Sequence, residues 1–264
     1  MNNCPIMLTI AGSDCSSGAG IQADLKAAQA LGVYALTAVT CVVSEVPGTV
    51  RGIQEIPCDL VADQVAINLD SFNVGAIKTG MLYSPEIVYA IVEQLKRYEL
   101  PLIVDPVMIA TAGDSLMQDA AIAAYEAALL PLTTLLTPNL DEASVLLGGR
   151  TIHTETQMRK AAGDLAMKYH CAVLLKGGHL PGDMCIDYLV DEDGIEEGRW
   201  ERKRIEGVST HGTGCTLSAA IASGIAKGLG IRDAVDFGLG LVAKAIDTHL
   251  SWDSPKKIDA LNLF

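Results

Sequence analysis

Short apolar runs that fit buried strands alternate, along the whole chain, with amphipathic stretches that fit helices. Strands that are apolar on both sides and are joined by helices are typical of a parallel sheet covered by helices on both faces. Residues 185–190 and 198–204 flank Asp193-Gly194 and predict an antiparallel hairpin instead. The sequence therefore predicts a single α/β domain over residues 1–264, with three α/β/α layers and a central, mostly parallel sheet.

The expected elements follow from this hydrophobic pattern. Ser84-Pro85-Glu86, for example, combines a capping side chain, a first-turn proline and an acid near the positive end of the helix dipole, which predicts a helix start. The expected strands cover residues 7–10, 38–43, 76–79, 102–105, 134–137 and 172–176. The expected helices cover residues 18–31, 58–69, 84–98, 141–147, 155–169, 214–228 and 231–250, with an alanine-rich helix between the strands at 102–105 and 134–137.

Composition argues against several classes of protein. The 264 residues are 50% apolar and 19% charged, so the chain can bury a large core and extensive disorder is not expected. The net charge of −13 argues against a protein that binds nucleic acid or an anionic membrane. No apolar run approaches the ~20 residues of a bilayer span, and the first residues do not form a signal peptide. Seven cysteines without a CxxC spacing argue against a disulfide or zinc framework, so the sequence predicts a cytoplasmic enzyme with reduced thiols.

Two glycine-rich segments follow expected strands, where ligands bind in sheets of this kind. Residues 11–20 let the backbone approach a ligand and lead into a helix N-terminus, although a plain turn fits them equally well. Residues 210–220 place Gly212, Thr213 and Gly214 at a helix start, where their N–H groups suit a phosphoryl group. The first segment is not GxGxxG and the chain contains no GxxxxGK[ST], which argues against a dinucleotide fold and a P-loop.

Cys215 lies in the first turn of the helix that the second segment opens. The positive end of the helix dipole predicts a depressed thiol pKa at this position. The alternative is a buried thiol that behaves as a small apolar side chain. His211, four residues earlier, and His179 are interpreted as packing or loop residues rather than bases.

Lys176, Asn139 and Glu142 also follow expected strands. Lys176 precedes paired glycines, so it can meet a nucleotide phosphate as a point charge. Asn139 and Glu142 lie three residues apart at a helix start and could hold a hydrated magnesium ion. The alternative is that Asn139 caps the helix and that Glu142 is an acid of its first turn.

Several motifs occur along the chain in the following order: LTIAGSD (8–14), GAGIQADLK (18–26), KTGML (78–82), DPVM (105–108), TPN (137–139), KGGH (176–179) and HGTGCT (211–216). In these motifs the sequence resembles the hydroxymethylpyrimidine/phosphomethylpyrimidine kinases of thiamin biosynthesis, within the ribokinase-like superfamily. The resemblance implies a ribokinase-like fold and ATP-dependent phosphorylation of the hydroxymethyl group of 4-amino-5-hydroxymethyl-2-methylpyrimidine. It also implies a second transfer onto the resulting monophosphate.

The resemblance further implies roles for single residues. The superfamily usually has an aspartate base where this chain has Cys215, so a thiolate is expected to take the proton of the substrate hydroxyl. The backbone N–H groups expected to stabilise the moving phosphoryl group belong to Gly212, Thr213, Gly214 and Cys215. The pyrimidine pocket is expected to contain Gly12, Ala19, Asp24, Met81 and Val107. The nucleotide is expected to contact Asn139, Lys176 and Thr213, and magnesium to contact Asp105 and Glu142. ATP and Mg²⁺ are the expected cofactors, a homodimer is expected, and a requirement for a monovalent cation is left open.

Glu45 is a departure from the family pattern, because many relatives carry glutamine there to bind the pyrimidine amino group and a ring nitrogen. A carboxylate only accepts hydrogen bonds, so either Glu45 or the ring nitrogen must carry a proton for both bonds to form. The alternative is that Glu45 points to solvent in the segment that follows. Cys15 and Ser17 also replace the proline and glycine of many relatives, which alters the loop over the substrate.

Other functions remain as alternatives. A pyridoxal or pyridoxine kinase, or a kinase for a related aminopyrimidine, would use the same chemistry on another ring. A thiol hydrolase would pair Cys215 with His211 and would need no ATP. A nicotinamide oxidoreductase is disfavoured because the dinucleotide fingerprint is missing.

Overall fold

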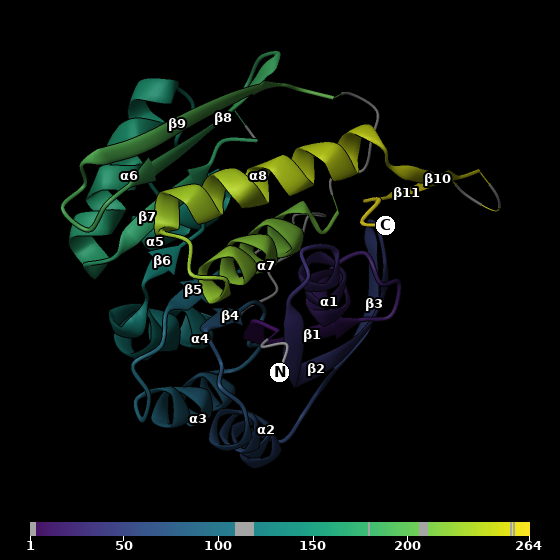
Figure 1. The fold of residues 1–264 in the computed structure, drawn as a ribbon. Helices are drawn as coiled ribbons and strands as arrows, with labels where there is room; N and C mark the ends of the chain where they lie inside the picture. The colour runs from purple at the N-terminus through teal and green to yellow at the C-terminus, as the bar shows by residue number, and fades with distance from the viewer. Residues whose placement is uncertain (1–3, 109–118, 179, 206–210, 254, 256) are drawn as a thin grey trace.

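The structure, a computed structural model, describes residues 4–108, 119–178, 180–205, 211–253, 255 and 257–264. Its centre is a nine-stranded sheet in the order β3-β2-β1-β4-β5-β6-β7-β8-β9 (Figure 1). The strands are β1 (Ile6–Asp14), β2 (Tyr34–Val46), β3 (Thr49–Glu55), β4 (Ala76–Thr79), β5 (Leu102–Val104), β6 (Leu135–Leu136), β7 (Ala172–Lys176), β8 (Met184–Val190) and β9 (Glu196–Lys203). Neighbours from β2 to β7 pair in parallel, whereas β3, β8 and β9 pair antiparallel to their neighbours. The mostly parallel sheet and the hairpin near Asp193 are therefore confirmed.

Helices cover both faces of this sheet, because the side chains of the central strands alternate between two apolar cores. On β1, Met7 packs into one core, while Leu8 and Ile10 pack into the other. The core that contains Met7 includes side chains of α1 (Gly20–Ala30), α7 (Thr213–Ala226) and α8 (Ile231–Asp247). The opposite core includes side chains of α2 (Cys58–Ser71), α3 (Pro85–Leu95), α4 (Asp119–Ala124), α5 (Leu140–Leu146) and α6 (Glu155–Tyr169) (Figure 1). The predicted three-layer arrangement is confirmed.

The hydrophobic pattern does not predict three of the strands. β3 is mostly exposed and contains Gly52 and polar residues, so it lacks the apolar run of a buried strand, and pairing with the long β2 holds it. β10 (Leu250–Trp252) and β11 (Ile258–Ala260) form a separate short pair after α8, which ends at Asp247. The alanine-rich helix is α4, which continues into a π-helical turn at Tyr125–Leu129; residues 109–118 of that interval lie outside the described part of the chain.

The topology positions the functional site. From β1, in the interior of the sheet, the chain moves to β2 on one side and later returns to β4 on the other side of β1. In such sheets the crevice beyond the carboxyl ends of the strands, at the point where the strand order reverses, is the usual ligand site. Within the described ranges no helix is both long and apolar enough to cross a membrane.

Candidate active site

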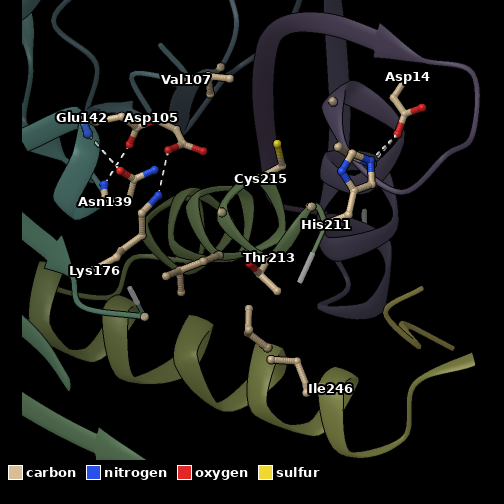
Figure 2. A pocket seen from close by; sticks show the side chains of 18 of the residues that line it. Asp14, Asp105, Val107, Asn139, Glu142, Lys176, His211, Thr213, Cys215 and Ile246 are labelled. Carbon is tan, nitrogen blue, oxygen red and sulfur yellow. Dashed lines mark hydrogen bonds and ion pairs between the residues drawn. The ribbon is translucent and has the colours of Figure 1, made fainter. Parts of the chain in front are cut away.

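A cleft of about 1090 Å³ runs along the carboxyl ends of the strands. Every predicted site residue lines it except Asp24: Gly12, Ala19, Glu45, Met81, Asp105, Val107, Asn139, Glu142, Lys176, Gly212, Thr213, Gly214 and Cys215. The loops after β1, β4, β5, β6 and β7 and the start of α7 thus meet in one place. Figure 2 shows the charged residues at one end of the cleft and Cys215 between them and the His211–Asp14 pair.

One end of the cleft is apolar. Cys41 and Met81 form a small buried cluster against which Val107 packs. A Cβ on Gly12 would lie 2.8 Å from Cys41 Sγ and 3.0 Å from Met81 Cε, so the backbone of β1 approaches this cluster as only glycine allows. The backbone of Val107 has a positive φ of 37°. This end suits a flat, apolar ring.

Glu45 lines the same end of the cleft and is half-buried. The Cys15 thiol lies 3.1 Å from the Glu45 carbonyl oxygen and accepts from the Glu45 N–H at 3.3 Å, which ties the end of β2 to the loop after β1. Burial, and to a smaller extent the charge of Asp14, raises the pKa of Glu45. A carboxyl with a raised pKa can carry the proton that hydrogen bonding to a ring nitrogen requires.

Asp24 does not line the cleft, which corrects the role implied by the resemblance. It lies behind the wall with no exposed side-chain surface, and its carboxylate is 2.9 and 2.8 Å from Lys78 Nζ. The Thr9 hydroxyl donates to the same carboxylate at 2.5 Å. Burial alone would lower the pKa of Lys78, but Asp24 raises it to about 12. Asp24 is therefore the counter-ion of a buried lysine that does line the cleft.

A second ion pair lies at the other end of the cleft. Lys176 Nζ is 3.0 Å from Asp105 Oδ1, and the Ser218 hydroxyl lies 3.3 Å from Asp105 Oδ2 (Figure 2). Burial alone would lower the pKa of Lys176, but Asp105 and Glu142 raise it. Lys176 is therefore a partly buried cation at the end of β7, close to two carboxyl groups.

Asn139 and Glu142 form a capping box at the start of α5. Asn139 Oδ1 accepts from the N–H groups of Asp141 and Glu142 at 2.9 Å, and Glu142 accepts from the Asn139 N–H at 2.8 Å. The helix-capping alternative is therefore confirmed for Asn139. Burial raises the pKa of Glu142 to about 7, although Lys176 opposes this shift. The described residues contain no cluster of three or more ligands ready to hold a metal ion, but two adjacent carboxyl groups, Asp105 and Glu142, fit a hydrated Mg²⁺.

The turn at the start of α7 lies between the two ends. Gly212 is the residue before the helix and has a φ of +79°. The first N–H groups of a helix are not bonded within it and attract anions. The prediction of a depressed Cys215 pKa is wrong, because burial raises it to about 11 despite the opposing effects of Lys78 and the Gly20 backbone N–H. Desolvation thus raises the pKa of Cys215 more than the helix terminus lowers it.

Some functional residues carry signals that the sequence analysis did not use. Lys78 is the charged residue of the buried strand β4, and a lysine that is buried in this way requires a counter-ion. Asp14 ends β1 and pairs with His211, whose Nε2 lies 3.2 Å from Asp14 Oδ2. The interpretation of His211 as a loop residue therefore omits its hydrogen bond to Asp14, and His179 lies outside the described residues.

Solved structures share this arrangement of the chain. The ADP complex of Bacillus subtilis pyridoxal kinase has 33% sequence identity and a TM-score of 0.88, over 98% of each chain. The phosphomethylpyrimidine kinase of Clostridium difficile has 36% identity and a TM-score of 0.79, over 91% of this chain and 99% of the other. The fold and the site define a small-molecule kinase of the ribokinase-like fold.

The family follows from the sequence comparisons. The family model described as phosphomethylpyrimidine kinase matches residues 14–258. The hydroxymethylpyrimidine/phosphomethylpyrimidine kinase of Streptomyces coelicolor is 42% identical over 242 residues, which are 92% of this chain and 88% of that protein. The chain belongs to the phosphomethylpyrimidine kinase family.

Proposed function

We propose that the protein transfers the terminal phosphoryl group of ATP to the hydroxymethyl group of 4-amino-5-hydroxymethyl-2-methylpyrimidine, and then transfers a second one to the monophosphate. The observation that carries this proposal is the cleft itself, in which an apolar pocket around Met81 and an end that contains the Lys176–Asp105 ion pair meet at the turn before α7. Relatives that are 42% and 41% identical to this chain carry the matching name. The described chain would act as one kinase domain.

In this proposal the nucleotide occupies the end of the cleft that contains Lys176. Leu217 of α7 and Val242 and Ile246 of α8 also line the cleft and offer an apolar surface for a base. Asn139 and Thr213 also line it and would contact the nucleotide. A related structure, Staphylococcus aureus pyridoxal kinase, is a complex with AMP-PCP and pyridoxal at 31% identity and a TM-score of 0.86, over 99% of this chain and 94% of that one, which supports the use of ATP.

The phosphoryl group would pass over the turn formed by Gly212, Thr213 and Gly214. Their N–H groups stabilise the charge that develops on the transferred group, and Lys176 neutralises part of it. Asp105 and Glu142 would hold Mg²⁺, which supplies further charge neutralisation when it is bound. The Cys215 thiolate would accept the proton of the substrate hydroxyl. A homodimer is part of the proposal, and light scattering should then give a mass twice the 27.8 kDa of the chain.

Phosphate-transfer assays with hydroxymethylpyrimidine, its monophosphate and pyridoxal, run side by side, test the proposed function. We expect ADP release to depend on each pyrimidine and to have the highest kcat/KM with the pyrimidines. The pyridoxal kinases that match this chain over 98% and 99% of its length favour pyridoxal as the second candidate acceptor. Higher efficiency with pyridoxal than with hydroxymethylpyrimidine would overturn the proposal.

Gly214→Ala tests the place of the nucleotide. An added Cβ would lie 3.2 Å from Lys176 Nζ and 3.5 Å from Asp105 Oδ2, so the ion pair must shift. We expect kcat/KM for ATP to fall about tenfold, because small displacements of positioned groups slow transfer. Thermal stability should not fall, since alanine favours a helix more than glycine does. Gly240→Ala on α8, where an added Cβ meets nothing within 4 Å, is the matched control. Equal kcat/KM for both variants would contradict this placement.

Glu45→Gln tests the recognition of the pyrimidine. A proton on Glu45 or on the ring nitrogen allows both hydrogen bonds, and as the pH rises this proton is lost and two acceptors face each other. We expect the wild-type KM for the pyrimidine to increase with pH, while the Glu45→Gln protein stays active with a KM that changes little. Steady-state kinetics over a pH series measure this difference. Identical pH profiles for the two proteins would exclude the charged pair.

A further inference from the structure

The loop after β1 and the turn before α7 touch at three points. His211 Nε2 lies 3.2 Å from Asp14 Oδ2. Gly212 packs on the carbonyl of Gly18, where an added Cβ would be only 1.8 Å from the oxygen. The backbone N–H of Gly20, the first residue of α1, lowers the pKa of the Cys215 thiol, so these two residues also lie close together. The two segments therefore have one defined relative position.

Asp14 is the centre of the first segment. Its carboxylate accepts hydrogen bonds from the N–H groups of Ser16, Gly18 and Ala19 at 2.7, 3.0 and 2.8 Å, and from the Ser16 hydroxyl at 3.0 Å. Only 1% of its side chain is exposed. Burial alone would raise the pKa of Asp14, but hydrogen bonds from His211 and Ser16 hold it well below its usual range. Asp14 is thus a fixed anion that His211 can bind.

His211 connects this anion to the turn. It directly precedes Gly212, and 13% of its side chain is exposed. Its ring lies on Gly18, where an added Cβ would be 2.7 Å from His211 Cδ2. The imidazole is therefore enclosed between the loop that contributes Ala19 to the cleft and the turn that contributes Thr213.

We infer that His211 and Asp14 are positioning residues that fix the phosphoryl-binding turn relative to the acceptor pocket. The inference rests on the proposed function, because it assigns the turn to the transferred group and the loop to the acceptor side. Neither side chain has to touch the reacting atoms. When the pair is broken, both substrates still bind, but the acceptor oxygen and the phosphorus are misaligned. Turnover then falls, and water competes with the acceptor for the phosphoryl group.

The experiment measures ADP and phosphorylated pyrimidine in the same reaction. For His211→Ala we expect product formation to fall at least about tenfold, while the KM of each substrate changes less than about threefold. The amount of ADP formed per product should rise above one, since ATP is lost to water. His211→Asn, which keeps an N–H donor toward Asp14, should bring the ratio back toward one. His153→Ala, at an exposed histidine before α6, is the matched control and should behave as the wild type.

The ratio of ADP to product does not depend on how much of a variant is folded, because both come from the same active molecules. A His211→Ala protein with wild-type turnover, or one in which ADP and product fall together with a ratio of one, would overturn the positioning role. A wild-type protein that phosphorylates none of the three acceptors would instead overturn the proposed function.

Discussion

Replacement of Cys215 by alanine is expected to reduce the turnover number for the hydroxymethyl substrate about 100-fold. The thiolate is the form that accepts a proton, and burial raises the pKa of Cys215 to about 11, although Lys78 opposes the shift. Below that pKa the thiolate fraction increases roughly tenfold with each pH unit. Wild-type turnover should therefore increase with pH between about 7 and 10, and the Cys215→Ala protein should lack this increase. Pre-steady-state or steady-state turnover over a pH series measures both effects.

Cys171→Ala is the matched control for this prediction. Cys171 is a fully buried thiol, with a pKa that burial raises to about 12, and it packs in the core that contains Leu8, away from the cleft. This variant should keep the wild-type pH dependence. Cys215→Asp should give turnover that is flat in the alkaline range, because a carboxylate is already ionised at neutral pH. Wild-type turnover in Cys215→Ala would remove the thiol as proton acceptor and leave the N–H groups of the turn as the main catalytic groups.

The sheet could be predicted because its central strands are buried on both faces. β1 and β7 are apolar at consecutive positions, and this pattern marks a parallel strand without knowledge of its neighbours. β3 could not be predicted in this way. Its residues are mostly exposed, and it is a strand only because Cys41–Val46 of β2 provide a partner. Local sequence carries no information about that pairing.

The sequence predicts which loops form the site, but it does not predict which of their side chains contact one another. Lys176 and Asp105 each end a strand, so the topology places them at one edge, yet their ion pair depends on the packing of α7 through Gly214. The Cys215 pKa depends on burial by several segments, which the helix position alone does not reveal. For Asp24 the resemblance gave the right neighbourhood, but only the structure shows that its carboxylate faces Lys78.

Asp24→Asn is expected to lower the free energy of unfolding by about 3–5 kcal/mol, because it leaves the ammonium of Lys78 buried without a counter-ion. Urea denaturation at neutral pH measures this loss. In the wild type, Asp24 raises the pKa of Lys78 to about 12, above the ordinary 10.5, after burial is overcome. On the alkaline side the contribution of the Lys78 charge is therefore complete below 10.5 and is lost as the pH rises through about 12; on the acid side the ion pair forms only above the pKa of Asp24, which burial raises. In the Asp24→Asn protein only the smaller effects of Cys215 and Asp105 oppose burial, so the pKa of Lys78 falls and stability should instead increase with pH.

The double variant Asp24→Leu, Lys78→Met is the matched control, since it removes both charges and keeps apolar volume in their place. We expect it to recover all but about 1 kcal/mol of the loss, which remains because the Thr9 hydroxyl loses its acceptor. A loss below about 1 kcal/mol for Asp24→Asn alone would contradict a buried ion pair. Lys78 lowers the pKa of Cys215 and Asp24 raises it to a smaller extent, so the double variant should stay stable but turn over more slowly at neutral pH. If this variant is as stable as expected but does not turn over, the contribution of the pair to folding is distinct from its electrostatic effect on the Cys215 thiol.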